Sequence, residues 1–78
     1  MRVIKEESFS IYVYAEDHAP PHCHVRFKDK KELSVILPSL KGMYGKKIPK
    51  EVKQVIKDNI DSLCDMWEQL NPEKTHNK

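Results

Sequence analysis

Two histidines separated by one residue are the part of this sequence best suited to chemistry. His22 and His24 flank a single cysteine. On an extended strand, residues at this spacing project side by side from the same face. Paired imidazoles can exchange protons near neutral pH or coordinate a metal ion, and the spacing permits either use.

The acid–base interpretation predicts chemistry of the ribonuclease type. The paired imidazoles would move protons, while Arg26 or Lys28 would stabilise the negative charge of a phosphate. Asp17 and His18, in the loop that precedes the histidines, are further candidate catalytic residues. Tyr12 and Tyr14 are expected on the same face, where their rings would offer surfaces on which unpaired bases stack.

The metal interpretation uses the same residues as ligands. His22 and His24 would supply nitrogen, and Asp17 or His18 would complete a three- or four-coordinate site. A structural alternative is that one imidazole hydrogen-bonds a loop carboxylate such as Asp17 while the other is solvated. Because His-x-His is short and common, we assign no metal and predict no cofactor.

Extended segments are expected to position these side chains. Alternation with a period of two predicts strands at residues 9–14, 22–28 and 32–37, with a tight turn at Asp29 and Lys30. A short fourth strand is expected around Met43 and Tyr44. One face of this sheet would be apolar. The other would carry Tyr12, Tyr14, His22, His24, Arg26, Lys28, Ser34 and Ile36.

An amphipathic helix is expected to cover the apolar face. From Val52 to Leu70, apolar residues recur at steps of three and four, and Pro49 suits the first helical position. The predicted fold class is therefore α+β, with a three- to four-stranded antiparallel sheet packed on one C-terminal helix. Residues 1–72 would form a single domain and residues 73–78 a disordered tail.

Lysines gather just before and within this helix. Six lysines lie between residues 41 and 57 against one acid, Glu51. Lys46, Lys47 and Lys50 stand near the start of the helix, where the positive end of its dipole disfavours them. This arrangement predicts a surface that attracts a phosphate backbone or an acidic partner, and the alternative is a solvated lysine face.

The length and composition of the chain limit the size of its core and the kinds of protein it can be. With 78 residues, 38% of them hydrophobic, the chain can build one small core, and association with a partner protein or a second copy would supplement it. The tyrosine-bearing face is the expected interface for such association. The sequence contains no apolar run of about 20 residues, so we expect a cytoplasmic protein without a membrane span. Cys23 and Cys64 are expected to stay reduced.

Several segments in this order resemble a known family. They are Ile11-Tyr12-Val13-Tyr14, Glu16-Asp17-His18, Pro20-Pro21-His22-Cys23-His24-Val25, Gly45-Lys46-Lys47-Ile48-Pro49 and Met66-Trp67-Glu68. Over about residues 9–72 the chain resembles the bacterial domain of unknown function 4160. The resemblance implies that Asp17, His18, Pro21, His22, His24 and Trp67 occupy the motif positions of the family. It assigns them no catalytic role, and Cys23 stands where an aromatic residue is usual.

The resemblance also implies a genomic setting. Members of the family are small bacterial proteins, often encoded beside a second domain of unknown function, number 2442, in pairs of toxin–antitoxin type. We therefore expect the toxin-like half of a two-protein module that acts on RNA through His22, His24 and a cationic sheet face. The alternatives are a non-catalytic interaction or dimerisation module and, third, a metal-binding domain.

Overall fold

The fold is an antiparallel sheet followed by two helices. The computed structural model describes residues 2–15 and 20–72 of the 78. Five strands follow one another in the sheet in chain order: β1 (Arg2–Lys5), β2 (Phe9–Tyr12), β3 (His22–Phe27), β4 (Glu32–Ile36) and β5 (Lys41–Gly42). A 3₁₀ turn, η1 (Met43–Gly45), then leads into helices α1 (Lys50–Asp58) and α2 (Ile60–Leu70).

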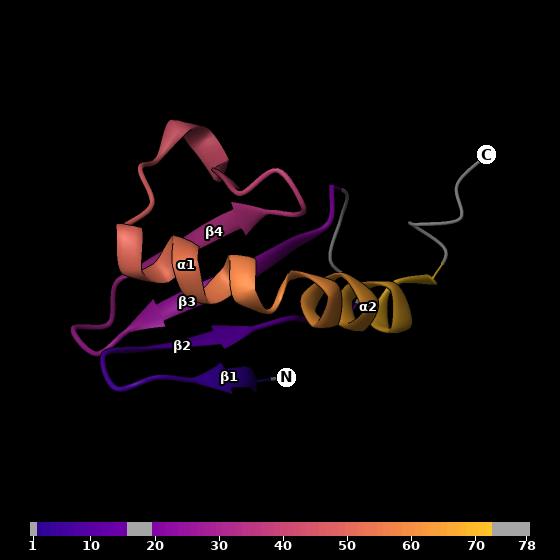
Figure 1. Ribbon diagram of the computed structural model, residues 1–78, viewed down its shortest axis with the longest axis horizontal. Coiled ribbons are helices and arrows are strands. Elements are labelled where there is room, and N and C mark those ends of the chain that lie inside the picture. Colours follow the sequence, from indigo (N-terminus) through magenta and orange to yellow (C-terminus); the bar gives the residue numbers. More distant parts are fainter. Residues whose placement is uncertain (1, 16–19, 73–78) are drawn as a thin grey trace.

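Both helices lie across the same face of the sheet (Figure 1). Strand alternation turns Ile11, Val25 and Val35 toward them, and each of these side chains is fully buried. The helices contribute four further buried side chains to this core: Val52, Ile56, Leu63 and Trp67. The α+β class and the packing of the sheet on C-terminal helical structure are therefore confirmed.

The register of the central strands agrees with the expected alternation. Tyr12 pairs with His24 across β2 and β3, and His24 pairs with Ser34 across β3 and β4. These residues lie on the face opposite the helices, which within the described residues no helix covers. We call this surface the open face. It carries Ser10, Tyr12, Tyr14, His22, His24, Arg26, Glu32, Ser34 and Ile36.

The sheet has more strands than expected. Strand β1 was not predicted, because Val3 and Ile4 stand among charged residues in the sequence and become part of the core only through their position beside β2. The fourth predicted strand, around Met43 and Tyr44, is also wrong. Pairing with β4 involves Lys41–Gly42 instead, and Tyr44 has the left-handed backbone of a turn, with φ of 61°.

The single predicted helix is two helices. Asn59 separates them with φ of −120° and ψ of 22°, and its side chain donates a hydrogen bond to the Val55 carbonyl, 2.8 Å away. Asparagine competes in this way with the helical backbone. The apolar stripe continues across the interruption from Ile56 to Ile60, so its periodicity gave no sign of a break. Pro49 precedes the first helical residue rather than occupying it.

The remaining predictions concern the turn, the tail and the membrane. The tight turn is confirmed: the Lys31 amide donates to Asp29 Oδ1 at 3.1 Å, and Lys30 has a positive φ of 74°. The tail at residues 73–78 lies outside the described residues. In the described part of the chain, no helix is both long enough and apolar enough to cross a membrane.

Candidate functional site

Four rings lie in contact across the open face. The His22 and His24 ring centroids are 4.9 Å apart, and those of His24 and Tyr14 are 4.8 Å apart. Tyr14 in turn stacks on Tyr12 at 6.0 Å, with an interplanar angle of 17°. We call these four side chains the ring row. The predicted placement of both imidazoles beside both phenols is thus what the structure shows.

The first ring, His22, is held inside the protein. Its side chain is only 2% exposed, and Nδ1 lies 2.7 Å from the carbonyl oxygen of Pro20. A carbonyl oxygen can only accept, so Nδ1 carries the proton and donates it. The expectation that both imidazoles reach the surface is therefore wrong for His22.

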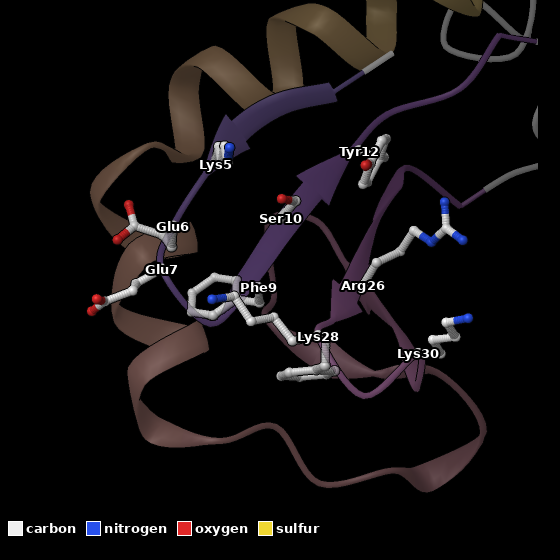
Figure 2. A pocket seen from close by; sticks show the side chains of 10 residues that line it. Lys5, Glu6, Glu7, Phe9, Ser10, Tyr12, Arg26, Lys28 and Lys30 are labelled. Atoms are coloured by element: carbon white, nitrogen blue, oxygen red, sulfur yellow. The ribbon is translucent and has the colours of Figure 1, made fainter.

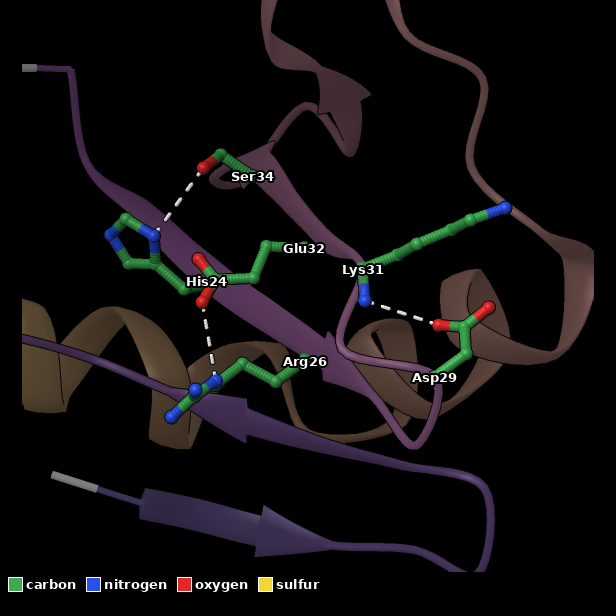
Figure 3. A network of polar contacts seen from close by, with 6 residues as sticks. All are labelled: His24, Arg26, Asp29, Lys31, Glu32 and Ser34. Atoms are coloured by element: carbon green, nitrogen blue, oxygen red, sulfur yellow. Dashed lines mark hydrogen bonds and ion pairs between the residues drawn. The ribbon is translucent and has the colours of Figure 1, made fainter.

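The second ring, His24, remains partly exposed in the centre of the sheet. Its Nδ1 lies 3.4 Å from Ser34 Oγ on the neighbouring strand, a long hydrogen bond that orients the ring (Figure 3). The edge of His22 and the ring of Tyr14 flank it. Of the two histidines, His24 is thus the one placed to meet a bound molecule.

A cation continues the ring row beyond Tyr12. The Arg26 guanidinium carbon is 5.8 Å from the centroid of the Tyr12 ring, within the range of a cation–π contact. Arg26 Nε also lies 3.2 Å from Glu32 Oε2, its cross-strand partner (Figure 3). Both side chains are about half exposed, so water screens this pair and it holds Arg26 in place only weakly.

A surface cavity of about 520 Å³ opens where the ring row meets the strand ends. Tyr12 and Arg26 form one part of its wall (Figure 2). Phe9 and Phe27 contribute apolar surface. Four bases and two acids complete or border it: Lys5, Arg26, Lys28, Lys30, Glu6 and Glu7. Lys28 follows the end of β3 and belongs to this rim rather than to the centre of the sheet.

The other predicted lysines lie elsewhere. Lys46 and Lys47 line a hollow beside η1, and Lys50 lines a second hollow beside α1. Helix α1 covers the face opposite the ring row, so Lys50 lies away from the histidines. Lys46 also lines a third hollow with Glu32 and Ser34, and Ser34 is the residue that bonds His24. The sequence predicted the sheet face and the lysines near the start of the helix as two candidate surfaces, and in the structure Lys47 and Lys50 line hollows apart from the ring row.

One contributor to the site was missed. Asn71 is only 3% exposed, and its Nδ2 donates to the Tyr14 carbonyl at 3.0 Å and to the Trp67 carbonyl at 3.1 Å. It therefore joins the end of α2 to the segment that carries the Tyr14 ring. An Asn before a Pro predicts the end of a helix, and no other feature of the sequence indicates that Asn71 bonds to Tyr14. The Trp67 indole nitrogen is buried and has no hydrogen-bond partner among residues 2–15 and 20–72.

Of the candidate metal ligands, His22 and His24 are among the described residues and Asp17 and His18 are not. Within residues 2–15 and 20–72, no three His, Cys, Asp or Glu side chains come together as metal ligands. Asp17 and His18, which were also predicted as catalytic residues, lie outside the described residues. Cys23 and Cys64 are free thiols, and burial raises the pKa of Cys23 to about 12.

Comparison with known proteins adds the family. A family model described as "Domain of unknown function (DUF4160)" matches residues 8–68, which include the ring row and both helices up to Glu68. Neither the curated proteins nor the solved structures gave a match.

Proposed function

The chain belongs to the DUF4160 family, a domain of unknown function, and we propose that it binds single-stranded RNA on the open face as the toxin-type half of a two-protein module. The ring row is the observation that carries this proposal. Sheets that bind unpaired RNA present aromatic rings on which successive bases stack. Tyr12, Tyr14 and His24 form such a surface here, with Tyr14 37% exposed.

The charges beside the ring row support a path for the RNA backbone. Lys28 and Lys30 stand at the end of the row, next to Tyr12 and Arg26 on the rim of the cavity. Four bases and two acids line the cavity, and Glu32, which is not among the lining residues, pairs with Arg26. A base stacked on Tyr12 would place its phosphate near these cations, and phosphate contacts dominate the affinity of such complexes.

The two histidines have different roles in this proposal. His24, partly exposed and hydrogen-bonded to Ser34, contacts the RNA and is the imidazole able to exchange a proton with it. His22 is buried, and its edge contact sets the orientation of His24. The chemistry therefore depends on one imidazole supported by another, rather than on two equivalent catalytic groups.

Growth of a bacterial host tests the toxin role. Expression of the chain should slow growth, and His24→Ala should relieve the effect. His24→Phe keeps an aromatic ring and removes the ring nitrogens, so it separates stacking from proton transfer. If His24→Phe remains as harmful as the wild type, His24 acts by stacking alone. A host whose growth the wild-type chain leaves unchanged would contradict the toxin role.

The open face is also a candidate interface between two copies of the chain. The Arg26–Glu32 pair reduces its net charge, and the partly buried Ile36 pairs with His22 at the far end of the face. A two-fold interface would bring the same face of two copies together. In that case Tyr12→Asp should convert a dimer to a monomer in light scattering. A wild-type chain that is already monomeric at high concentration would remove this alternative.

A further inference from the structure

A second surface, on the helical side of the molecule, has the features of a binding site. Two adjoining hollows of about 490 and 420 Å³ lie between the β5–η1 segment and α1, and they share Leu40 and Lys53. Six lysines line them: Lys41, Lys46, Lys47, Lys50, Lys53 and Lys57. No carboxylate is among the residues lining either hollow. We call this surface the lysine hollows.

The backbone that forms the wall of the hollows is closely constrained. Leu40 has a left-handed backbone with φ of 66°, and its amide donates to the Ile36 carbonyl at 2.8 Å. A Cβ atom on Gly42 would collide with the Lys46 carbonyl, so the chain crosses itself closely there and tolerates only glycine. The Lys46 amide in turn bonds the Met43 carbonyl at 3.3 Å. The surface is therefore formed before any partner arrives.

The floor of the hollows is apolar. Leu40 and Ile48 are partly buried side chains that pack against the core and line the hollows with their remaining surface. A phosphate backbone would satisfy the lysines but leave this apolar surface unused. A peptide with carboxylates around large apolar side chains complements both features, because charge steers it and apolar contact retains it.

We propose that the lysine hollows bind an acidic segment of a partner protein in which leucine-like side chains alternate with carboxylates. The apolar side chains occupy the hollows over Leu40 and Ile48, and the carboxylates pair with the surrounding lysines. The hollows beside α1 lie on the side of the sheet away from the open face, whereas Lys46 also borders a hollow that Glu32 and Ser34 line at the edge of the open face. The chain can therefore hold RNA at the ring row and the acidic partner beside α1 at once.

Two synthetic peptides test the proposal on the full chain. The first is a 12-residue peptide of Glu, Asp and three Leu, and the second has Ser in place of each Leu. Binding is followed by the amide shifts of the ¹⁵N-labelled protein. We expect the leucine peptide to bind at least about tenfold more tightly, since each buried Leu adds an apolar contact. The shifts should centre on Leu40, Ile48 and Lys53.

Matched charge reversals locate the site. Lys53→Glu, in both hollows, should weaken the leucine peptide about tenfold, whereas Lys31→Glu makes the same charge change in the β3–β4 turn and should alter binding less than twofold. Equal affinity for the two peptides, or equal effects of the two variants, would overturn the proposal. So would a short RNA duplex that displaces the leucine peptide from the same amides at a lower concentration.

Discussion

At the scale of single residues, two histidines on the same face of strand β3 lie in different environments. His22 and His24 point to the same face, yet His22 is 2% exposed and hydrogen-bonded to Pro20, while His24 is partly exposed beside Tyr14. Strand alternation determines the face of a side chain but not what covers it. The imidazole of His22 is buried and held by Pro20, whereas that of His24 keeps part of its surface exposed.

The two hydrogen bonds of Asn71 predict that its substitution lowers the stability of the fold. Asn71→Ala removes the donor that serves the Tyr14 and Trp67 carbonyls in a buried position. We expect it to lower the free energy of unfolding by about 1–3 kcal/mol in urea titration. Gln54→Ala is the control: its amide bonds Asp58 at the surface, and its loss should cost less than about 0.5 kcal/mol. A similar cost for both variants would contradict the role of Asn71.

The buried thiol of Cys23 predicts how the free energy of unfolding depends on pH. Burial raises its pKa from 9.0 to about 12 in the folded protein, so the folded chain retains a proton that the unfolded chain loses. The retained proton therefore contributes nothing unfavourable below pH 9, and the free energy of unfolding declines as the pH rises from 9 to 12. From pH 7 to pH 10 the wild type should lose about 1 kcal/mol more than Cys23→Ala, measured by urea unfolding. Parallel losses in both proteins would refute this.

The sequence was sufficient to predict the ring row, because residue type and a period of two decide which side chains share a face. It could not predict the burial of His22. The bond from Asn71 to Tyr14 joins residues 57 positions apart, and no local pattern encodes it. Asp17 and His18 stay predictions, since they lie outside the described residues.

At the scale of elements, apolar periodicity identified the helical region but not its division. The stripe runs through α1 and α2 in one phase, whereas Asn59 interrupts the backbone with a bond from its own side chain. Strand β1 was not predicted, because a segment of four residues, two of them charged, is too short to show the alternation that indicates a strand. Both elements depend on tertiary packing more than on local preference.

Helix α2 supports the sheet beneath the ring row, and this predicts the effect of shortening a core side chain. Leu63 is fully buried, so Leu63→Ala should destabilise the fold by about 2–5 kcal/mol. The neighbouring Ser62 is exposed, and Ser62→Ala should change stability by less than about 0.5 kcal/mol. Thermal melts of the two variants that coincide would show that α2 is not part of the cooperative fold.

At the scale of the whole molecule, the sheet separates two surfaces of different character. One presents aromatic and imidazole rings with cations at one end, and the other presents lysines around Leu40 and Ile48. A small domain that places RNA on one side and a protein partner on the other fits the proposed two-protein module. Membership of DUF4160 is compatible with this arrangement but adds no function to it.

Binding of a fluorescent single-stranded RNA oligomer, followed by anisotropy at fixed salt, tests the central claim most directly. Tyr12→Ala combined with Tyr14→Ala should weaken binding by at least about 1–3 kcal/mol, because each ring supplies a stacking surface. Tyr44→Ala removes a ring that is 88% exposed in η1, outside the ring row, and should leave the affinity unchanged. Equal affinity of the wild type and the double variant would contradict the account.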